Sequence, residues 1–170
     1  DHGTIKGIYN QGEVDDSKVE FLKGALIPGF VNAHCHLELS HMEGVVPQHT
    51  GLPQFLMNVM TERGAKEKAV DKAMEAADKA MYENGIQAVG DHANSAVSAK
   101  IKENSPIQYH TFIEVMAMTD TDVDARIDQA KEIEFHFDYK RSSITPHAPY
   151  SCSKNLFKTF KKVVGEDNII

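Results

Sequence analysis

The sequence predicts an α/β fold, in which parallel strands alternate with helices. Three observations predict it. Apolar runs of strand length recur after residue 28, segments with helical spacing of apolar residues lie between them, and polar residues follow directly after four of the runs. Residues 1–28 lack this alternation. They contain short β-type runs separated by turn residues, in 3–27, so a small β segment is expected to precede the α/β part, 29–170.

The first half of the α/β part is predicted to contain two strands and two helices. The run 29–33 is the first strand. Residues 52–60 have apolar side chains at a spacing of three and four, with a proline suited to the first helical turn. A longer helix is predicted over 65–83, because one apolar stripe continues along it and the Asn-Gly pair that follows supplies a left-handed stop. Residues 86–91 are the second strand.

The second half repeats the alternation. Residues 107–116 form the third predicted strand, and a helix with apolar residues on one side follows from about Asp122 to Phe135. A fourth strand and its exit loop are predicted in 142–150. The last helix runs over 153–164, where the next glycine ends it, and residues 168–170 open a fifth strand.

Two architectures contain parallel strands joined by helices, an open doubly wound sheet and a (β/α)8 barrel. The open sheet usually has a glycine-rich phosphate loop after its first strand, and the sequence contains no such pattern. We therefore predict a partial (β/α)8 TIM barrel. A complete barrel needs about 250 residues, so 29–170 is expected to hold about the first four βα repeats, the N-terminal half. Residues 1–28 would belong to a small β-sandwich.

Barrel enzymes carry their chemistry at the C-terminal ends of the strands. The polar residues found there are His34, His36, Asp91, His92, Glu114 and His147. In an extended chain residues i and i+2 face the same side, so His34 and His36 should converge while Cys35 faces the helices. Two imidazoles make half of a tetrahedral metal site. An arbitrary His-x-His pair is nevertheless more often unrelated to a metal.

Longer stretches of sequence favour the metal site. The segment ALIPGFVNAHCHLELS resembles the first-strand signature of the metal-dependent amidohydrolase superfamily, and GIQAVGDHANS and TPHAPYSCS resemble segments of its deaminase and chlorohydrolase branch, which includes cytosine deaminase-like enzymes. The resemblance covers almost the whole chain. The His-Leu-Glu continuation is similar to that of the aminodeoxyfutalosine deaminase group, although three letters say little about a substrate.

The resemblance implies a mechanism with one divalent metal, Zn or Fe(II). The metal would be held by His34, His36, a histidine from strand five and an aspartate from strand eight, and would activate a water for attack with loss of ammonia. A glutamate three residues after the strand-five histidine would carry the proton. That glutamate and half of the ligands are expected beyond Ile170. The chain is therefore expected to be an N-terminal fragment, inactive alone, with weak metal binding or none.

The resemblance also implies that His147 contacts the substrate. Glu38 would orient His36 or contact the substrate, or would be solvated as a glutamate in a strand-exit loop often is, and the same alternatives hold for Glu114. Asp91 and His92 are expected to cap a helix together with Asn94.

Composition excludes several classes. With 41% hydrophobic and 25% charged residues and a net charge of −7, the chain is globular and lacks the basic surface that nucleic acid requires. No apolar run approaches the roughly 20 residues that cross a membrane. The two cysteines suit a reducing compartment, so we expect a cytoplasmic protein. A half barrel exposes strand edges and an apolar interior, which favours pairing with a second copy, a homo-oligomer.

The sequence thus predicts a metal-dependent aminohydrolase, a deaminase of a small-molecule substrate that is nucleobase-like or a related nitrogen heterocycle. Two alternatives remain open. One is a chlorohydrolase or cyclic-amide hydrolase on the same fold. The other is a stand-alone domain without catalysis that serves in binding or assembly.

Overall fold

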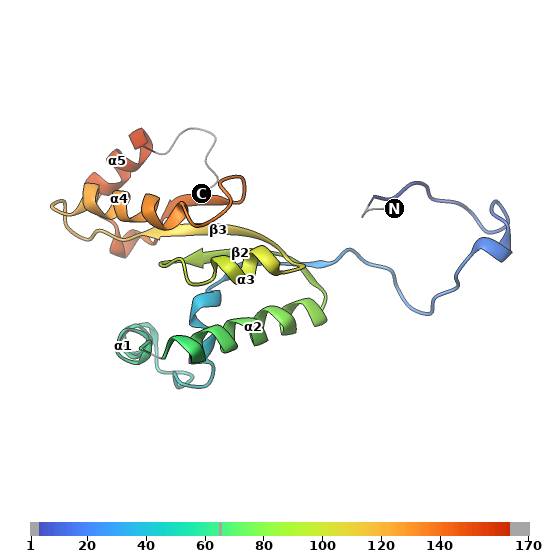
Figure 1. Ribbon diagram of the computed structural model, residues 1–170, viewed down its shortest axis with the longest axis horizontal. Helices are drawn as coiled ribbons and strands as arrows, with labels where there is room; N and C mark the ends of the chain where they lie inside the picture. The colour runs from blue at the N-terminus through green and yellow to red at the C-terminus, as the bar shows by residue number, and fades with distance from the viewer. Residues whose placement is uncertain (1–3, 65, 164–170) are drawn as a thin grey trace.

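The structure, a computed structural model, describes residues 4–64 and 66–163, and its centre is one parallel sheet with helices packed along it (Figure 1). The strands are β1 (Phe30–Cys35), β2 (Ile86–Ala93), β3 (Gln108–Val115) and β4 (Ser142–Pro146). The α-helices are α1 (Leu52–Glu62), α2 (Glu67–Glu83), α3 (Ala99–Asn104), α4 (Val123–Glu134) and α5 (Lys154–Val163). Short 3-10 helices are η1 (Asp16–Lys18), η2 (Leu37–Met42) and η3 (Pro149–Ser151).

The order of the strands confirms the predicted architecture. The four strands are all parallel and lie in the order β1-β2-β3-β4, so each strand pairs with the next strand of the chain. A doubly wound sheet would reverse direction at a switch point, whereas a barrel adds strands consecutively. The α/β fold and the partial barrel of about four repeats are therefore confirmed.

The two faces of the sheet differ in composition. Alternate residues of β2 and β3 are buried beneath the helices: Val89, Asp91, Ala93, Tyr109, Thr111, Ile113 and Val115. The other face corresponds to the interior of a barrel and carries mostly polar or aromatic residues, among them His92, His110, Phe112 and Glu114, together with Gly90. The apolar interior that we expected is therefore wrong for these strands. Two histidines and a glutamate, His92, His110 and Glu114, occupy inward positions on β2 and β3.

Most of the predicted helices are found within a residue or two of their expected bounds. The stop after α2 is also confirmed, because Gly85 has a φ of 85°, which a glycine adopts without strain. The sequence did not indicate α3, which has only six residues and is too short to show a period. The predicted fifth strand at 168–170 and the end of the last helix at Gly165 lie outside the described residues.

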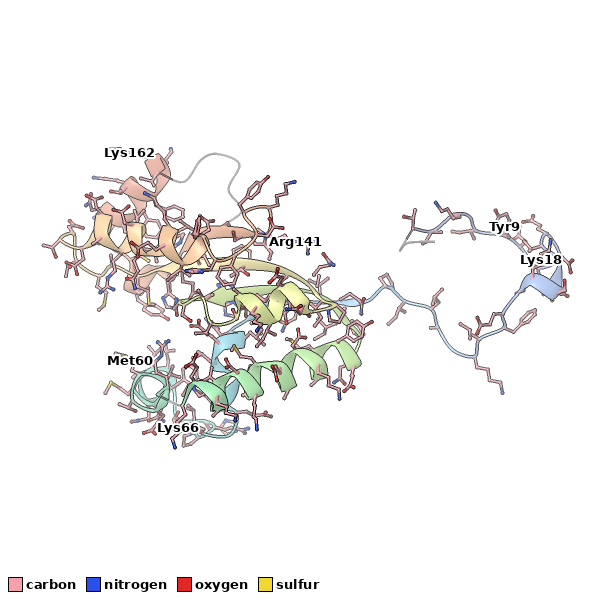
Figure 2. All side chains as sticks on the ribbon, viewed as in Figure 1. Tyr9, Lys18, Met60, Lys66, Arg141 and Lys162 are labelled. Carbon is pink, nitrogen blue, oxygen red and sulfur yellow. The ribbon has the colours of Figure 1, made fainter. Side chains whose placement is uncertain are left out.

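The predicted strands in 3–27 are wrong for the described part of that segment. Residues 4–29 contain only η1 and form an arm that extends away from the sheet, with Tyr9 and Lys18 far from the sheet and its α-helices (Figures 1 and 2). The apolar side chains of the arm are uncovered, Ile8 at 91% and Leu26 at 95% exposure. An isolated pair of strands is marginal without a packed face, and the arm has none among the described residues. The division into 1–28 and 29–170 stays a prediction.

The core consists of two clusters on the helix-covered side of the sheet. One joins β3 and β4 to α4 and α5, and the other joins η2, α2, β2 and β3. The second cluster contains Leu37, Met74, Val89, Ile107 and Tyr109. Because Leu37 directly follows His36, this cluster also anchors the end of β1. No helix among the described residues is both long and apolar enough to cross a bilayer.

Met74→Ala is expected to destabilise the chain by about 2–5 kcal/mol, the usual cost of truncating a buried methionine. Met74 lies in α2 with 0% exposure, and its side chain fills the cluster beneath η2. Urea unfolding followed by circular dichroism measures the change. Met57→Ala is the matched control, because Met57 in α1 is 57% exposed and its loss should cost less than about 0.5 kcal/mol. Equal effects of the two substitutions would contradict the described packing.

Candidate functional site

The end of β1 brings the two predicted metal-ligating histidines together. The ring centroids of His34 and His36 are 5.2 Å apart, with an angle of 67° between the rings. His34 is exposed and His36 is half-buried at the start of η2. The Nδ1 atom of His36 is buried and has no hydrogen-bond partner among the described residues. The pair therefore presents imidazoles at one edge of the sheet, and one of them has an unsatisfied nitrogen.

A third histidine, His92, lies beside this pair. Its ring stacks on His34 with the centroids 4.1 Å apart, and its centroid is 5.5 Å from that of His36. Its Nδ1 lies 3.2 Å from Oε1 of Glu114, whose side chain is 4% exposed. Burial lowers the pKa of His92, the neighbouring His34 lowers it further, and Glu114 opposes both. At neutral pH the ring is thus favoured in its neutral form.

The prediction that Asp91 and His92 cap a helix is wrong. β2 continues through both residues to Ala93, and α3 begins only at Ala99. The two side chains therefore point to opposite faces of the sheet, as alternation along a strand requires. His92 faces the other histidines, and Asp91 is buried under the helices.

Asp91 supports the His-x-His segment from beneath. Its Oδ1 accepts a hydrogen bond from the backbone N–H of Leu37 at 2.7 Å, directly after His36. Its Oδ2 forms an ion pair with Nζ of Lys102 at 2.5 Å, and Lys102 also donates to Oγ1 of Thr111 at 3.0 Å. Burial lowers the pKa of Lys102, while Asp91 raises it. This buried pair joins β2, α3 and β3 to the segment that carries the histidines.

Glu38 is buried at 4% exposure, so its solvated alternative is wrong. Its carboxylate accepts hydrogen bonds from the Asn94 backbone N–H at 3.2 Å and from Ser95 Oγ at 2.6 Å. Asn94 in turn donates from Nδ2 to Oε2 of Glu114 at 3.2 Å. Glu38, Asn94, Glu114 and His92 therefore form one connected series of polar contacts. Glu38 thus holds the loop after β2, its Oε1 also lies 3.8 Å from the guanidinium of Arg63 after α1, and none of these described contacts is with His36.

Two further residues were singled out in the sequence, Cys35 as a packing residue and His147 as a substrate contact. Cys35 packs against the cluster around Met74, on the side away from the histidines, as alternation predicted. Burial, reinforced by Asp91, raises the pKa of its thiol to about 12. His147 follows β4, where its Nδ1 lies 2.6 Å from Ser151 Oγ and its ring meets that of Tyr150 edge-on at 5.8 Å. It lies at the same end of the sheet as the other site residues, within a loop of its own.

The described residues fit a divalent metal only in part. They contain no group of three or more His, Cys, Asp or Glu side chains placed to hold an ion. His34 and His36 supply two imidazoles, ligands that suit Zn or Fe(II). His92 is not aimed with them, because its ring lies at only 30° to that of His34, face against face. A complete tetrahedral set would take its other ligands from outside the described residues.

A barrel-type sheet with a His-x-His pair at the end of its first strand is an arrangement typical of hydrolases that act on amide and amidine bonds. The chain belongs to the amidohydrolase family, whose sequence profile matches residues 25–170. It is similar to an adenosine deaminase of Helicobacter pylori (strain ATCC 700392 / 26695), with 25% identity over 146 residues, 82% of this chain and 35% of that protein.

Two solved structures share the fold. One is aminofutalosine deaminase of Helicobacter pylori in complex with methylthio-coformycin, with a TM-score of 0.63, 24% identity, and coverage of 79% of this chain and 35% of that chain. The other is guanine deaminase of C. acetobutylicum with bound guanine, with a TM-score of 0.60, 21% identity, and coverage of 80% and 37%. The chain thus spans about a third of the length of these relatives. The deaminase branch of the family, which the sequence motifs indicated, fits all three.

Proposed function

We propose that this chain supplies the His-x-His part of the active site of a metal-dependent aminohydrolase. The observation that carries the proposal is the convergence of His34 and His36 at the end of β1 in a chain of the amidohydrolase family. The unsatisfied, buried Nδ1 of His36 supports it, since a buried polar atom without a partner is costly unless a ligand or a change of orientation satisfies it. His34 and His36 would hold the metal, Zn or Fe(II).

The chemistry of the proposed reaction is loss of ammonia from an amidine-like carbon of a nitrogen heterocycle. The bound metal would supply a Lewis acid that lowers the pKa of a water toward 7. Around it, this chain provides a neutral His92 and the Glu114 carboxylate at the same edge of the sheet. The substrates or ligands named for the relatives, adenosine, guanine and methylthio-coformycin, are nucleobase-like. They support the same substrate class for this protein.

Three side chains are proposed as substrate contacts. Glu114 lies near the end of β3 and His147 follows β4, at the edge of the sheet where the histidines lie, which supports direct contact with a substrate placed over them. Glu38 holds Asn94 and Ser95, so it would act on the substrate through the loop after β2. We propose a cytoplasmic location, which the two free cysteines, Cys35 and Cys152, support.

A substrate panel combined with metal removal tests the proposal. The protein that contains this chain and the remaining ligands is expected to release ammonia from one of adenosine, guanine, cytosine or a related nucleoside. Treatment with a chelator should abolish the release, and added Zn²⁺ or Fe²⁺ should restore it, because the metal generates the nucleophile. The 170 residues alone are expected to release none.

Three outcomes would contradict the proposed metal-dependent deaminase. Turnover that is unchanged after verified metal removal would contradict the metal site. Release of chloride from a chlorinated heterocycle, or opening of a cyclic amide, in the absence of ammonia release would assign the same fold to the alternative reactions. No turnover of any of these compounds by a metal-loaded protein would favour a domain that only binds or assembles.

A further inference from the structure

A row of stacked rings crosses the inner face of the sheet, from β1 to β3. His34 stacks on His92, with centroids 4.1 Å apart and 30° between the rings. The other neighbour of His92 is Phe112, at 5.1 Å and 27°. His92 and Phe112 are also paired in the register of β2 and β3. The ring of His92 therefore lies between the ring of the exposed His34 and the ring of Phe112.

Two further features lie next to His92 on this face of the sheet. Its Nδ1 meets Oε1 of Glu114 at 3.2 Å, and Glu114 is itself held by Nδ2 of Asn94 at 3.2 Å. Gly90, two residues earlier on the same face, allows β1 to lie close above β2. A Cβ on Gly90 would come to 2.9 Å from the carbonyl oxygen of Ala33, the residue before His34. The close approach of β1 to β2 at this point thus accompanies the stacking of the His34 ring on the His92 ring.

The orientation of the His34 side chain depends on stacking against His92 more than that of His36 does. His36 is half-buried and is followed by Leu37, whose side chain is fully buried and whose N–H is held by Asp91. His34 is exposed and belongs to β1, the edge strand of the described sheet. An exposed side chain loses rotational freedom when it binds a metal. If the His92 ring already holds the His34 side chain in one orientation, less rotational freedom is lost when His34 binds the metal.

We propose that His92 is a positioning residue, which orients the imidazole of His34 for the metal by stacking against it and does not bind the metal itself. The inference rests on the proposed function in that it takes His34 as a ligand. Parallel rings in face-to-face contact direct their nitrogens within separate planes, so the two rings do not aim at one point. Nδ1 of His92 lies 3.2 Å from Oε1 of Glu114, a contact by distance that does not have hydrogen-bond geometry.

Two substitutions separate positioning from ligation. His92→Phe keeps an aromatic ring and removes both nitrogens, whereas His92→Ala removes the ring. Zn²⁺ affinity, measured by competition with a chromogenic chelator on the protein with its complete ligand set, should fall about tenfold or more in His92→Ala, as is typical when a supporting residue of a metal ligand is lost. In His92→Phe it should stay within about threefold of the wild-type value.

The second measurement needs no metal and so tests the stacking independently of the proposed function. The Cε1–H proton of His34, assigned by its loss in His34→Ala, should carry a ring-current shift in the metal-free chain. That shift should persist in His92→Phe and disappear in His92→Ala. His110→Ala is the matched control, because His110 lies on the same face but contacts Phe112 and Ser143. It should leave both the affinity and the shift unchanged.

Each contrary result has one meaning. If His92→Phe loses as much Zn²⁺ affinity as His92→Ala while the shift persists, His92 is a ligand and the inference is overturned. If the shift of His34 is the same in His92→Ala as in the wild type, the rings do not stack and the inference is again overturned. If His34→Ala leaves Zn²⁺ affinity unchanged, the proposed metal site fails, whatever the stacking measurement shows.

Discussion

Lys102→Met is expected to destabilise the chain by about 3–5 kcal/mol, because it leaves a buried carboxylate without its counter-charge. The side chains of Lys102 and Asp91 are 5% and 0% exposed. Methionine keeps most of the volume of the lysine side chain, so the loss reports charge more than packing. Asp91 also accepts the N–H of Leu37, and the substitution should therefore loosen the segment that carries His36. Urea unfolding measures the free energy.

The double variant Asp91→Asn/Lys102→Met tests whether the loss of stability comes from the uncompensated charge of Asp91. Asparagine retains a carbonyl oxygen for the Leu37 N–H while both charges are removed, and replacing a whole buried pair by uncharged groups is often neutral. The double variant should recover most of the lost stability. Lys100→Met in the same helix is the control, since Lys100 is exposed and its change should stay within about 0.5 kcal/mol. If the double variant is as unstable as Lys102→Met alone, the unpaired charge of Asp91 is not the cause of the instability.

His34→Ala and His36→Ala are each expected to reduce kcat/KM for deamination on the order of a thousandfold. Metal-ion catalysis supplies several kcal/mol, and each 1.36 kcal/mol is a factor of ten in rate. Ammonia release gives the rate, and elemental analysis of the purified variants gives the metal content, which should fall with it. His136→Ala is the control, because His136 is exposed after α4 and lies outside the site. Full activity of His34→Ala or His36→Ala at unchanged metal content would eliminate the His-x-His site.

Much of the fold follows from local pattern. The helix-period stripe of α2 and the Asn-Gly stop after it are local signals, and the structure confirms both. The prediction of strands in 3–27 was wrong because strand formation does not depend on local pattern alone. The residues of this segment have the composition of strands, but a strand forms only where another strand pairs with it, and that condition is not contained in a short window of sequence. The six-residue α3 forms where Lys102 meets Asp91, a tertiary contact that periodicity does not reveal.

For the candidate site, too, local sequence pattern predicted some features and missed others. The convergence of His34 and His36 and the opposite direction of Cys35 follow from alternation along a strand, and the structure agrees. The position of His92 in β2, beside His34, was missed because Asp-His before Asn resembles a helix cap. A signal was present, since Asp91 lies between Val89 and Ala93 in a run that alternates toward the core. A charged residue at a core position indicates a buried partner, and the strand therefore had to extend past it.

The consecutive order of the strands also bears on how the protein is made. In the described sheet, each strand pairs only with its neighbours along the chain. During synthesis, β2 can therefore dock on β1 as soon as α2 and β2 have left the ribosome, and β3 and β4 each find a completed edge waiting. Contacts that are near in sequence form quickly, and early burial limits the time that apolar surface is free to aggregate. The sheet can thus grow one repeat at a time, in the direction of translation.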